Sequence, residues 1–287
     1  MTLLALSLVL SSAVLHATWN LFAKRAGGGA AFVWLFNALS AVIYAPFALG
    51  AAIIQRPHIG VVEIAFMAGS TALHTVYFLT LQRGYRVGDL SLVYPIARGT
   101  GPALSTTAAI LVFGERPTPL AILGALLVAV SVFALTGGGR HSDDPARRRA
   151  AVLYGLVTGV LIASYTLWDK HAVGVLLIPP LLFDWANTIG RTALITPHAL
   201  RHWGAIRAEW REHRREAFVV AIFSPLAYIL VLTALVFTPV SYVAPAREIS
   251  ILIGTMMGAR LLSEGDGRRR MIAAGGMVLG VIALAVG

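Results

Sequence analysis

The chain has 287 residues, of which 57% are hydrophobic and only 13% charged, and its mean hydropathy is +0.78. A soluble domain carries about 25% charged residues and about 45–50% apolar ones, so this composition excludes a soluble protein and indicates one that crosses a membrane several times. The absence of cysteine excludes a disulfide scaffold, a thiol nucleophile and a Cys-based zinc site. The net charge of +10 would suggest nucleic-acid binding in a soluble protein, but here the positions of the charges decide its meaning.

Ten stretches are long and apolar enough to cross a bilayer, because a spanning helix needs about 20 mostly apolar residues. We expect these spans at 3–23, 30–54, 61–82, 90–113, 119–137, 150–169, 174–198, 217–236, 240–261 and 270–286. The first is expected to remain as a membrane helix, since no Lys or Arg precedes it as in a signal peptide. The separator 201–216 holds five Arg and three Glu, which predicts a short helix on the lipid headgroups.

The basic residues predict the orientation of the chain. Of the 23 Lys and Arg residues, 17 fall in the odd-numbered connections or at the span ends that border them, three in the even-numbered connections and three well inside spans. Cytoplasmic loops carry the excess of Lys and Arg, so the odd-numbered connections are expected in the cytoplasm and both termini outside. The membrane would be an inner (plasma) membrane of the bacterial type. The positive charge is thus interpreted as an orientation signal, and no nucleic-acid partner is expected.

The two halves of the chain resemble each other at an offset of 149–150 residues. The matching segments are Trp19-Asn20 with Trp168-Asp169, Ser91-x-Val93-x-Pro95 with Ser241-x-Val243-x-Pro245, and Gly114-Glu115 with Ser263-Glu264. Five spans per half is an odd number, so the halves must have opposite orientations, a pattern typical of secondary transporters. The predicted fold is an all-α integral membrane protein with ten transmembrane helices in two inverted five-helix repeats, at 1–139 and 150–287, joined by a basic linker at 140–149.

At these segments the chain resembles a known family. The string 16–20, His-Ala-Thr-Trp-Asn, followed by Lys24-Arg25 is similar to the first-helix signature of EamA-type members of the drug/metabolite transporter superfamily. The segment 88–100, running on to Gly114-Glu115, resembles that family's fourth helix, and 243–248 resembles its counterpart in the second half. The resemblance implies a central cavity and alternating-access transport, often export, of amino acids or related small metabolites. Ten-helix members usually keep their termini inside, whereas the charge distribution places them outside.

Arg98 is the first candidate for substrate binding. An ionisable residue inside a span costs about 2.5–3.5 kcal/mol on insertion scales, so it normally faces a cavity or a partner. Arg98 follows Pro95, which removes a backbone donor, and a discontinuous helix of this kind points polar backbone at a substrate. We expect Arg98 to bind a substrate carboxylate, with Tyr94 on the same helical face. The alternative is a structural salt bridge between spans.

Arg247 and Glu248 occupy the matching place in the ninth span. Glu248 follows Pro245 by three residues, as Arg98 follows Pro95. Pseudo-symmetry therefore predicts unlike charges at equivalent positions across the cavity. Glu248 would then either pair with Arg98, the favoured alternative, or act as a proton-coupling carboxylate.

Three further groups of polar and aromatic residues are candidates for the cavity wall. His16 and His74 would line it or relay protons, or each would simply hydrogen-bond to a neighbouring helix; two His without a third ligand predict no metal site. Asp184, Asn187 and Arg191 share one face of the seventh span, which would line the pathway or tie the helix to its neighbours.

The aromatic candidates are Trp19, Tyr77, Tyr165 and Trp168. They would form walls for a substrate, but aromatic belts at the membrane interface use the same residue types. Because the two tryptophans fall near the ends of predicted spans, the belt is the favoured interpretation for them. Separately, Gly276-x-x-x-Gly280 allows close helix contact, within the chain or in a homodimer.

These features favour a secondary-active carrier that exports amino acids or related small polar metabolites. A lipid or lipid-linked metabolite flippase on the same scaffold is the alternative. No Gly-Lys-Ser/Thr phosphate loop is present, which argues against ATP-driven transport. An enzyme is not expected, because the adjacent acidic pair Asp143-Asp144 lies in a loop with no helix to orient it. The expected partners are a small-molecule substrate and the bilayer, with no cofactor.

Overall fold

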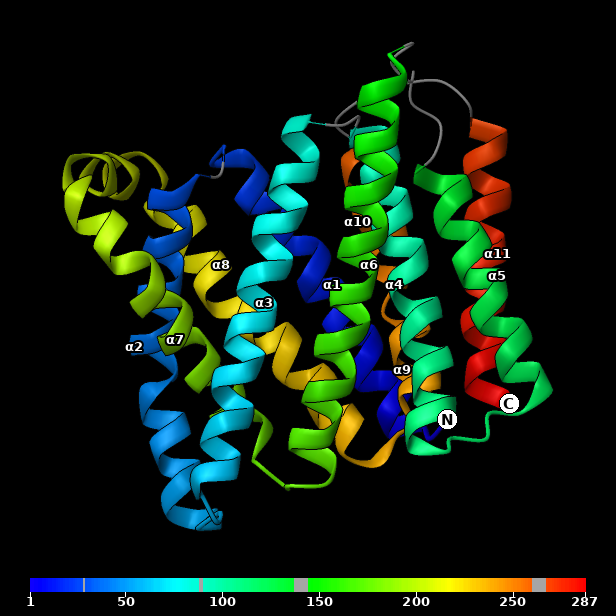
Figure 1. Ribbon diagram of the computed structural model, residues 1–287, viewed down its shortest axis with the longest axis horizontal. Coiled ribbons are helices and arrows are strands. Elements are labelled where there is room, and N and C mark those ends of the chain that lie inside the picture. Colours follow the sequence, from blue (N-terminus) through cyan, green and yellow to red (C-terminus); the bar gives the residue numbers. More distant parts are fainter. Residues whose placement is uncertain (28, 88–89, 137–143, 260–266) are drawn as a thin grey trace.

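The computed structural model describes residues 1–27, 29–87, 90–136, 144–259 and 267–287 (Figure 1). The described residues form helices and no strand. The helices are α1 (Leu3–Arg25), α2 (Ala30–Gln55), α3 (Val61–Val87), α4 (Leu90–Phe113), α5 (Pro119–Thr136), α6 (Pro145–Gly174), α7 (Pro180–Arg201), α8 (Trp203–Phe237), α9 (Val240–Ala246), α10 (Ile249–Ala259) and α11 (Gly267–Val286).

The helices have the length and surface of a multi-pass membrane protein. Among the described residues, α1, α2, α3, α6 and α8 are each long and apolar enough to cross a membrane, and α5 and α11 contain shorter apolar stretches, Pro119–Leu135 and Met271–Val286. Large apolar side chains such as Ile54, Val61 and Leu111 are 78–85% exposed. Soluble proteins rarely expose extended apolar patches, so these surfaces fit contact with lipid and the all-α class expected from the composition.

Side chains fix several helix ends. The hydroxyl of Thr2 accepts a hydrogen bond from the Ala5 amide at the start of α1 (3.2 Å). Glu115, just after α4, accepts from the amides of Val240 (2.7 Å) and Ser241 (2.9 Å), so it caps the start of α9 from another part of the chain. A carboxylate at a helix N-terminus satisfies free amides and complements the helix dipole.

Lys170 caps the C-terminal end of α8, just before the start of α9. Its ammonium group donates to the carbonyl oxygens of Leu235 (2.6 Å) and Thr238 (3.2 Å), where α8 ends. A cation at a helix C-terminus pairs with unsatisfied carbonyls. The short connection from α8 to α9 is therefore held by one side chain from α6 and one from the end of α4.

The helices run up and down in alternation (Figure 1). Both chain termini lie at the lower edge of the view, whereas the turn from α1 to α2 and the turn from α7 to α8 lie at the upper edge. The end of α1, which has the sequence Lys24-Arg25, and the arginine-rich first part of α8 thus lie at the same end of the bundle.

The helix interruption lies in the ninth predicted span and not in the fourth. We expected Pro95 to make the fourth span discontinuous, but α4 continues through both Pro95 and Pro102. The ninth span is instead divided into α9 and α10 at Arg247 and Glu248. There the Glu248 amide bonds to the Pro245 carbonyl (3.1 Å), three residues back, which makes a tight turn. Pro95 and Pro245 occupy matching positions in the repeated motif, so a proline at this position does not by itself interrupt the helix.

The short helix predicted at 201–216 is present, whereas several helix boundaries differ from the predicted spans. The short helix forms the first part of α8, seen at the upper left of Figure 1, and non-helical backbone at His213 (φ −125°, ψ 23°) separates it from the apolar part. The sixth helix continues to Gly174, beyond the predicted end at residue 169. Of the predicted linker, 140–143 lies outside the described residues, as do Gly88-Asp89, Asp143 and Ser263-Glu264 of the motifs, while 145–149 begins α6.

The contact expected from Gly276-x-x-x-Gly280 is formed within the chain. Helix α11 lies beside α5 (Figure 1), and a Cβ added at Gly280 would come within 2.7 Å of the Val128 side chain. A Cβ at Gly124, on the facing helix, would lie 2.7 Å from the Gly280 carbonyl oxygen. Small residues thus let these two helices approach closely.

Replacing Gly280 with valine is expected to destabilise the protein by about 1–3 kcal/mol, because the added methyl groups would force α11 away from α5. The matched control is Gly275→Val on the same helix, where an added Cβ meets nothing within 4 Å. The measurement is the thermal unfolding temperature of each purified variant. Equal shifts for the two variants would contradict the packing role of Gly280.

Candidate functional site

A buried ion pair joins α4 to the turn between α9 and α10. Arg98 Nε lies 3.1 Å from Glu248 Oε2, and the two side chains are only 14% and 6% exposed. Of the alternatives that the sequence left open for Glu248, the structure contains the pair with Arg98. In the sequence, each of the two charged residues follows a proline by three positions.

This pair is held by charge without an aligned hydrogen bond. Arg98 Nε and Glu248 Oε2 are both buried, and neither has a hydrogen-bond partner with acceptable geometry. Buried charges are costly unless they are paired and well hydrogen-bonded, whereas a guanidinium can bind a carboxylate through two parallel hydrogen bonds. The observed pair therefore lacks an aligned hydrogen bond between Arg98 Nε and Glu248 Oε2.

Aromatic and basic side chains surround the pair. Tyr77, Tyr94 and Tyr165 lie within electrostatic range of Arg98. His16 lies within range of both Arg98 and Arg247. Five of the predicted cavity residues, Glu248 among them, thus lie within electrostatic range of one buried guanidinium.

Arg247, next to Glu248, points to a different neighbour. Its guanidinium lies over the ring of Tyr228, 5.5 Å from the ring centre, in cation–π geometry. The two adjacent charges at the turn between α9 and α10 are therefore directed to different helices, Glu248 to α4 and Arg247 to α8.

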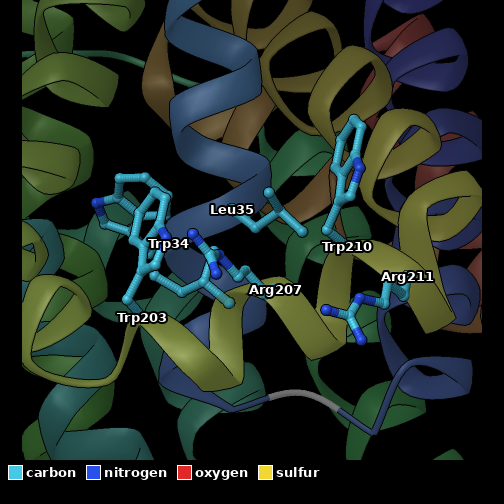
Figure 2. Close-up of a pocket in the computed structure, with 7 residues that line it drawn as sticks. Trp34, Leu35, Trp203, Arg207, Trp210 and Arg211 are labelled. Carbon is cyan, nitrogen blue, oxygen red and sulfur yellow. The ribbon is translucent and has the colours of Figure 1, made fainter.

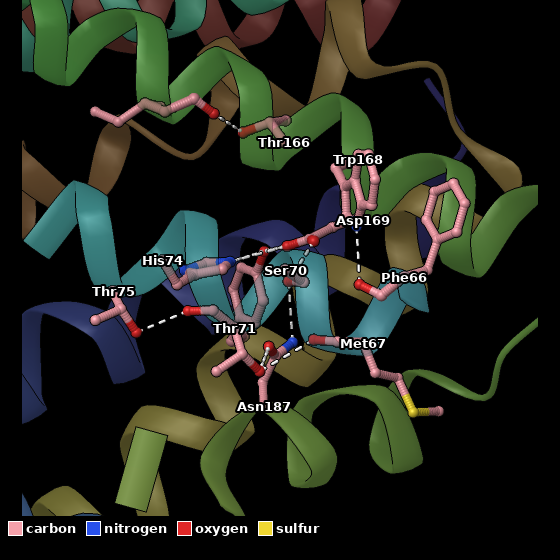
Figure 3. A network of polar contacts seen from close by, with 12 residues as sticks. Phe66, Met67, Ser70, Thr71, His74, Thr75, Thr166, Trp168, Asp169 and Asn187 are labelled. Atoms are coloured by element: carbon pink, nitrogen blue, oxygen red, sulfur yellow. Dashed lines mark hydrogen bonds and ion pairs between the residues drawn. The ribbon is translucent and has the colours of Figure 1, made fainter. Parts of the chain in front are cut away.

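A second buried cluster centres on Asp169 of α6 (Figure 3). Asp169 is fully buried. Its Oδ1 accepts a hydrogen bond from Ser70 (2.6 Å), its Oδ2 lies 2.9 Å from His74 Nε2, and the Tyr228 hydroxyl also donates to Oδ2. His74 thus bonds to a neighbouring helix, which was one of its two expected roles. Three helices, α3, α6 and α8, meet at this carboxyl group.

The polar stripe of α7 is divided between two environments. Asn187 accepts from Thr71 (2.8 Å) and donates to Ser70 (3.1 Å), so it ties α7 to α3 and extends the Asp169 cluster. Arg191 donates to Thr188 of its own helix (3.2 Å). Asp184 is 2% exposed on the same face. The shared face predicted from the sequence is therefore buried at Asp184 and Asn187 and half-buried at Arg191.

Tyr165 connects the two clusters. Its ring stacks on His74 with ring centres 4.1 Å apart, and meets Tyr77 edge-to-face at 5.5 Å. Since Tyr165 is also within electrostatic range of Arg98, the ion pair and the Asp169 cluster form one continuous polar and aromatic layer across the bundle.

The two tryptophans that the sequence favoured for an interfacial belt both contact other parts of the protein. The Trp168 indole N–H donates to the Phe66 carbonyl (2.8 Å) and its ring stacks on Phe66 at 4.3 Å, because α6 continues past the predicted end of the span. Trp168 therefore packs between α3 and α6. The Trp19 indole nitrogen is buried without a partner, and the ring meets His16 edge-on at 5.0 Å.

Asp169 was not identified from the sequence as the centre of a buried polar cluster. Asp169 entered only as a repeat match to Asn20, since it stood at the end of a predicted span; the signal that could have found it is an acidic residue within an apolar stretch. Ser70 and Tyr228 carried no such signal. In the described ranges, no group of three or more His, Asp or Glu residues could hold a metal ion.

Comparison with known proteins supports the fold. No protein-family model matches the chain, and no curated protein matches it. The structure is similar to a protein of known crystal structure, with a TM-score of 0.77 at 15% sequence identity. The similarity covers 98% of this chain and 96% of the other, so the two proteins share a fold over nearly their whole length.

Asp169→Ala is expected to lower the stability by about 3 kcal/mol, because three buried donors lose their acceptor. Asp169→Asn, which keeps one acceptor oxygen, should cost less, and Tyr228→Phe should cost about 1 kcal/mol. Thermal unfolding of the purified variants gives the order. An Asp169→Ala variant as stable as the wild type would show that the cluster does not hold the three helices together.

Proposed function

We propose that the chain is a secondary-active transporter of the EamA type within the drug/metabolite transporter superfamily. It exports amino acids or related small polar metabolites by alternating access, through a central cavity between two inverted repeats of five helices. The motifs around Trp19, Pro95 and Pro245 support the family, and the alternating helix directions support the repeat.

The observation that carries this proposal is the buried pair of Arg98 and Glu248. It joins a helix of the first half to a helix turn of the second half, at the positions that the internal repeat relates. Substrate sites of inverted-repeat transporters lie near the membrane midplane between the repeats. In the proposed mechanism, Arg98 can exchange the poorly aligned Glu248 carboxylate for the carboxylate of a substrate.

The same pair fits the chemistry of an amino acid. A substrate carboxylate would replace Glu248 on Arg98 with bidentate geometry, and the released Glu248 would receive the substrate ammonium group. Tyr77, Tyr94 and Tyr165 would supply hydroxyl groups and aromatic walls around it. Breaking the ion pair would also free the two halves to move against each other, which links substrate binding to alternating access.

Arg98→Ala is expected to abolish counterflow of amino acids in proteoliposomes, because the substrate carboxylate loses its partner. Glu248→Gln should weaken exchange of amino acids while keeping Arg98 available. Amines that lack the carboxylate should not exchange in any variant. The control is Arg116→Ala, which removes an exposed arginine outside the site.

Three outcomes would contradict this assignment. Counterflow of amines equal to that of amino acids would remove Arg98 from carboxylate recognition. Restoration of both folding and transport in the double variant Arg98→Ala with Glu248→Ala would make the pair structural only. Translocation of labelled lipid by a folded protein that shows no counterflow would favour the flippase.

The proposed orientation places the odd-numbered connections in the cytoplasm of a bacterial-type inner membrane. A reporter that is active only in the cytoplasm should be active when fused within 140–149 and inactive when fused after Gly287, because Lys and Arg concentrate in the odd-numbered connections. Activity of the C-terminal fusion would reverse the orientation.

A further inference from the structure

A groove of about 500 Å³ lies where the first part of α8 crosses the beginning of α2 (Figure 2). Its wall is formed by Trp34, Leu35, Trp203, Arg207, Trp210 and Arg211. It lies on the first part of α8, apart from the layer that holds Arg98 and Asp169, so it does not belong to the proposed transport site.

Two arginines give the groove a positive wall. Arg207 and Arg211 are four residues apart on one helix, so they share a face, and both are exposed. In the part of the chain that the structure describes, neither forms an ion pair with a carboxylate. The nearby Glu209 is engaged by His213, 3.0 Å away. Among the described residues, the two arginines of the groove are therefore free of a direct carboxylate partner.

The rest of the wall is aromatic. The rings of Trp34 and Trp203 meet edge-to-face with centres 5.8 Å apart, and the Trp34 indole donates to the Thr196 hydroxyl (2.9 Å). Trp203 and Trp210 remain 42% and 41% exposed. Tryptophan is enriched at the level of lipid headgroups, because its ring is apolar and its N–H is polar.

The position of the groove suits a membrane surface. Helix α2 and the later part of α8 are apolar and long enough to span a bilayer. The change of backbone direction at His213 separates the basic, tryptophan-bearing part of α8 from that apolar part. Arginines and exposed indole rings thus lie together at the end of two apolar helices.

We propose that this groove binds an anionic phospholipid, with Arg207 and Arg211 on the headgroup phosphate and with Trp203 and Trp210 against the glycerol backbone and upper acyl chains. Guanidinium groups bind phosphate with planar, multiple hydrogen bonds. The assignment does not depend on what the protein transports. Lipid bound there would hold the first part of α8 against α2.

The test is quenching of tryptophan fluorescence by brominated lipid in reconstituted protein. Brominated phosphatidylglycerol, at low mole fraction in phosphatidylcholine, should quench more strongly than brominated phosphatidylcholine. In Arg207→Gln with Arg211→Gln, the preference for phosphatidylglycerol should fall on the order of tenfold, since each basic residue near a membrane surface contributes to anionic-lipid attraction. The matched control is Arg214→Gln with Arg215→Gln, which removes the same charge from exposed positions outside the groove wall.

Each alternative outcome would overturn the proposal. Equal quenching by the two brominated lipids in the wild type would remove the lipid preference. Equal losses in the two double variants would assign the preference to general surface charge. Displacement by inorganic phosphate would assign the groove to a soluble anion. If the Arg207 and Arg211 double variant does not fold, Trp203→Phe in the wild-type background must reduce the quenching by phosphatidylglycerol, and unchanged quenching would equally reject the site.

Discussion

A charged pair in an apolar bundle imposes the strongest constraint on this molecule. Arg98 and Glu248 cannot each remain alone in so apolar an interior, so α4 and the turn between α9 and α10 must meet. That requirement fixes one contact between the first and second halves of the chain. Arg98 Nε and Glu248 Oε2 lack an aligned hydrogen bond, and the proposed exchange of Glu248 for a substrate carboxylate rests on that geometry.

The surrounding architecture keeps this pair in place. Glu115 and Lys170 hold the turn from α8 into α9, so the element that carries Glu248 begins at a fixed point. On the other side, the Asp169 cluster ties α3, α6 and α8 together, and Asn187 adds α7. Hydrogen-bonded contacts between helices therefore lie on both sides of the ion pair.

The contrast between the two halves is most visible at their prolines. Pro95 and Pro245 stand at the same register, and the motifs around them match, yet α4 is continuous and only the second helix is divided. Equivalent sequence patterns can thus have different backbone outcomes, because the surrounding packing decides whether a missing backbone hydrogen bond is tolerated. The same holds for Asn20 and Asp169, of which only Asp169 is buried in a cluster.

The sequence by itself determined the helical class, the apolar stretches, the surface part of α8 and the charges that sit inside the bundle. These features follow from composition and from the cost of burying polar groups, and both can be read from a short local stretch of sequence. Only the tertiary structure decided that Asp169 is the centre of a cluster, that Trp168 packs inside the bundle, and that Gly280 faces α5. Those outcomes depend on which helices are neighbours, and contacts between residues far apart in sequence leave no periodic pattern along the chain.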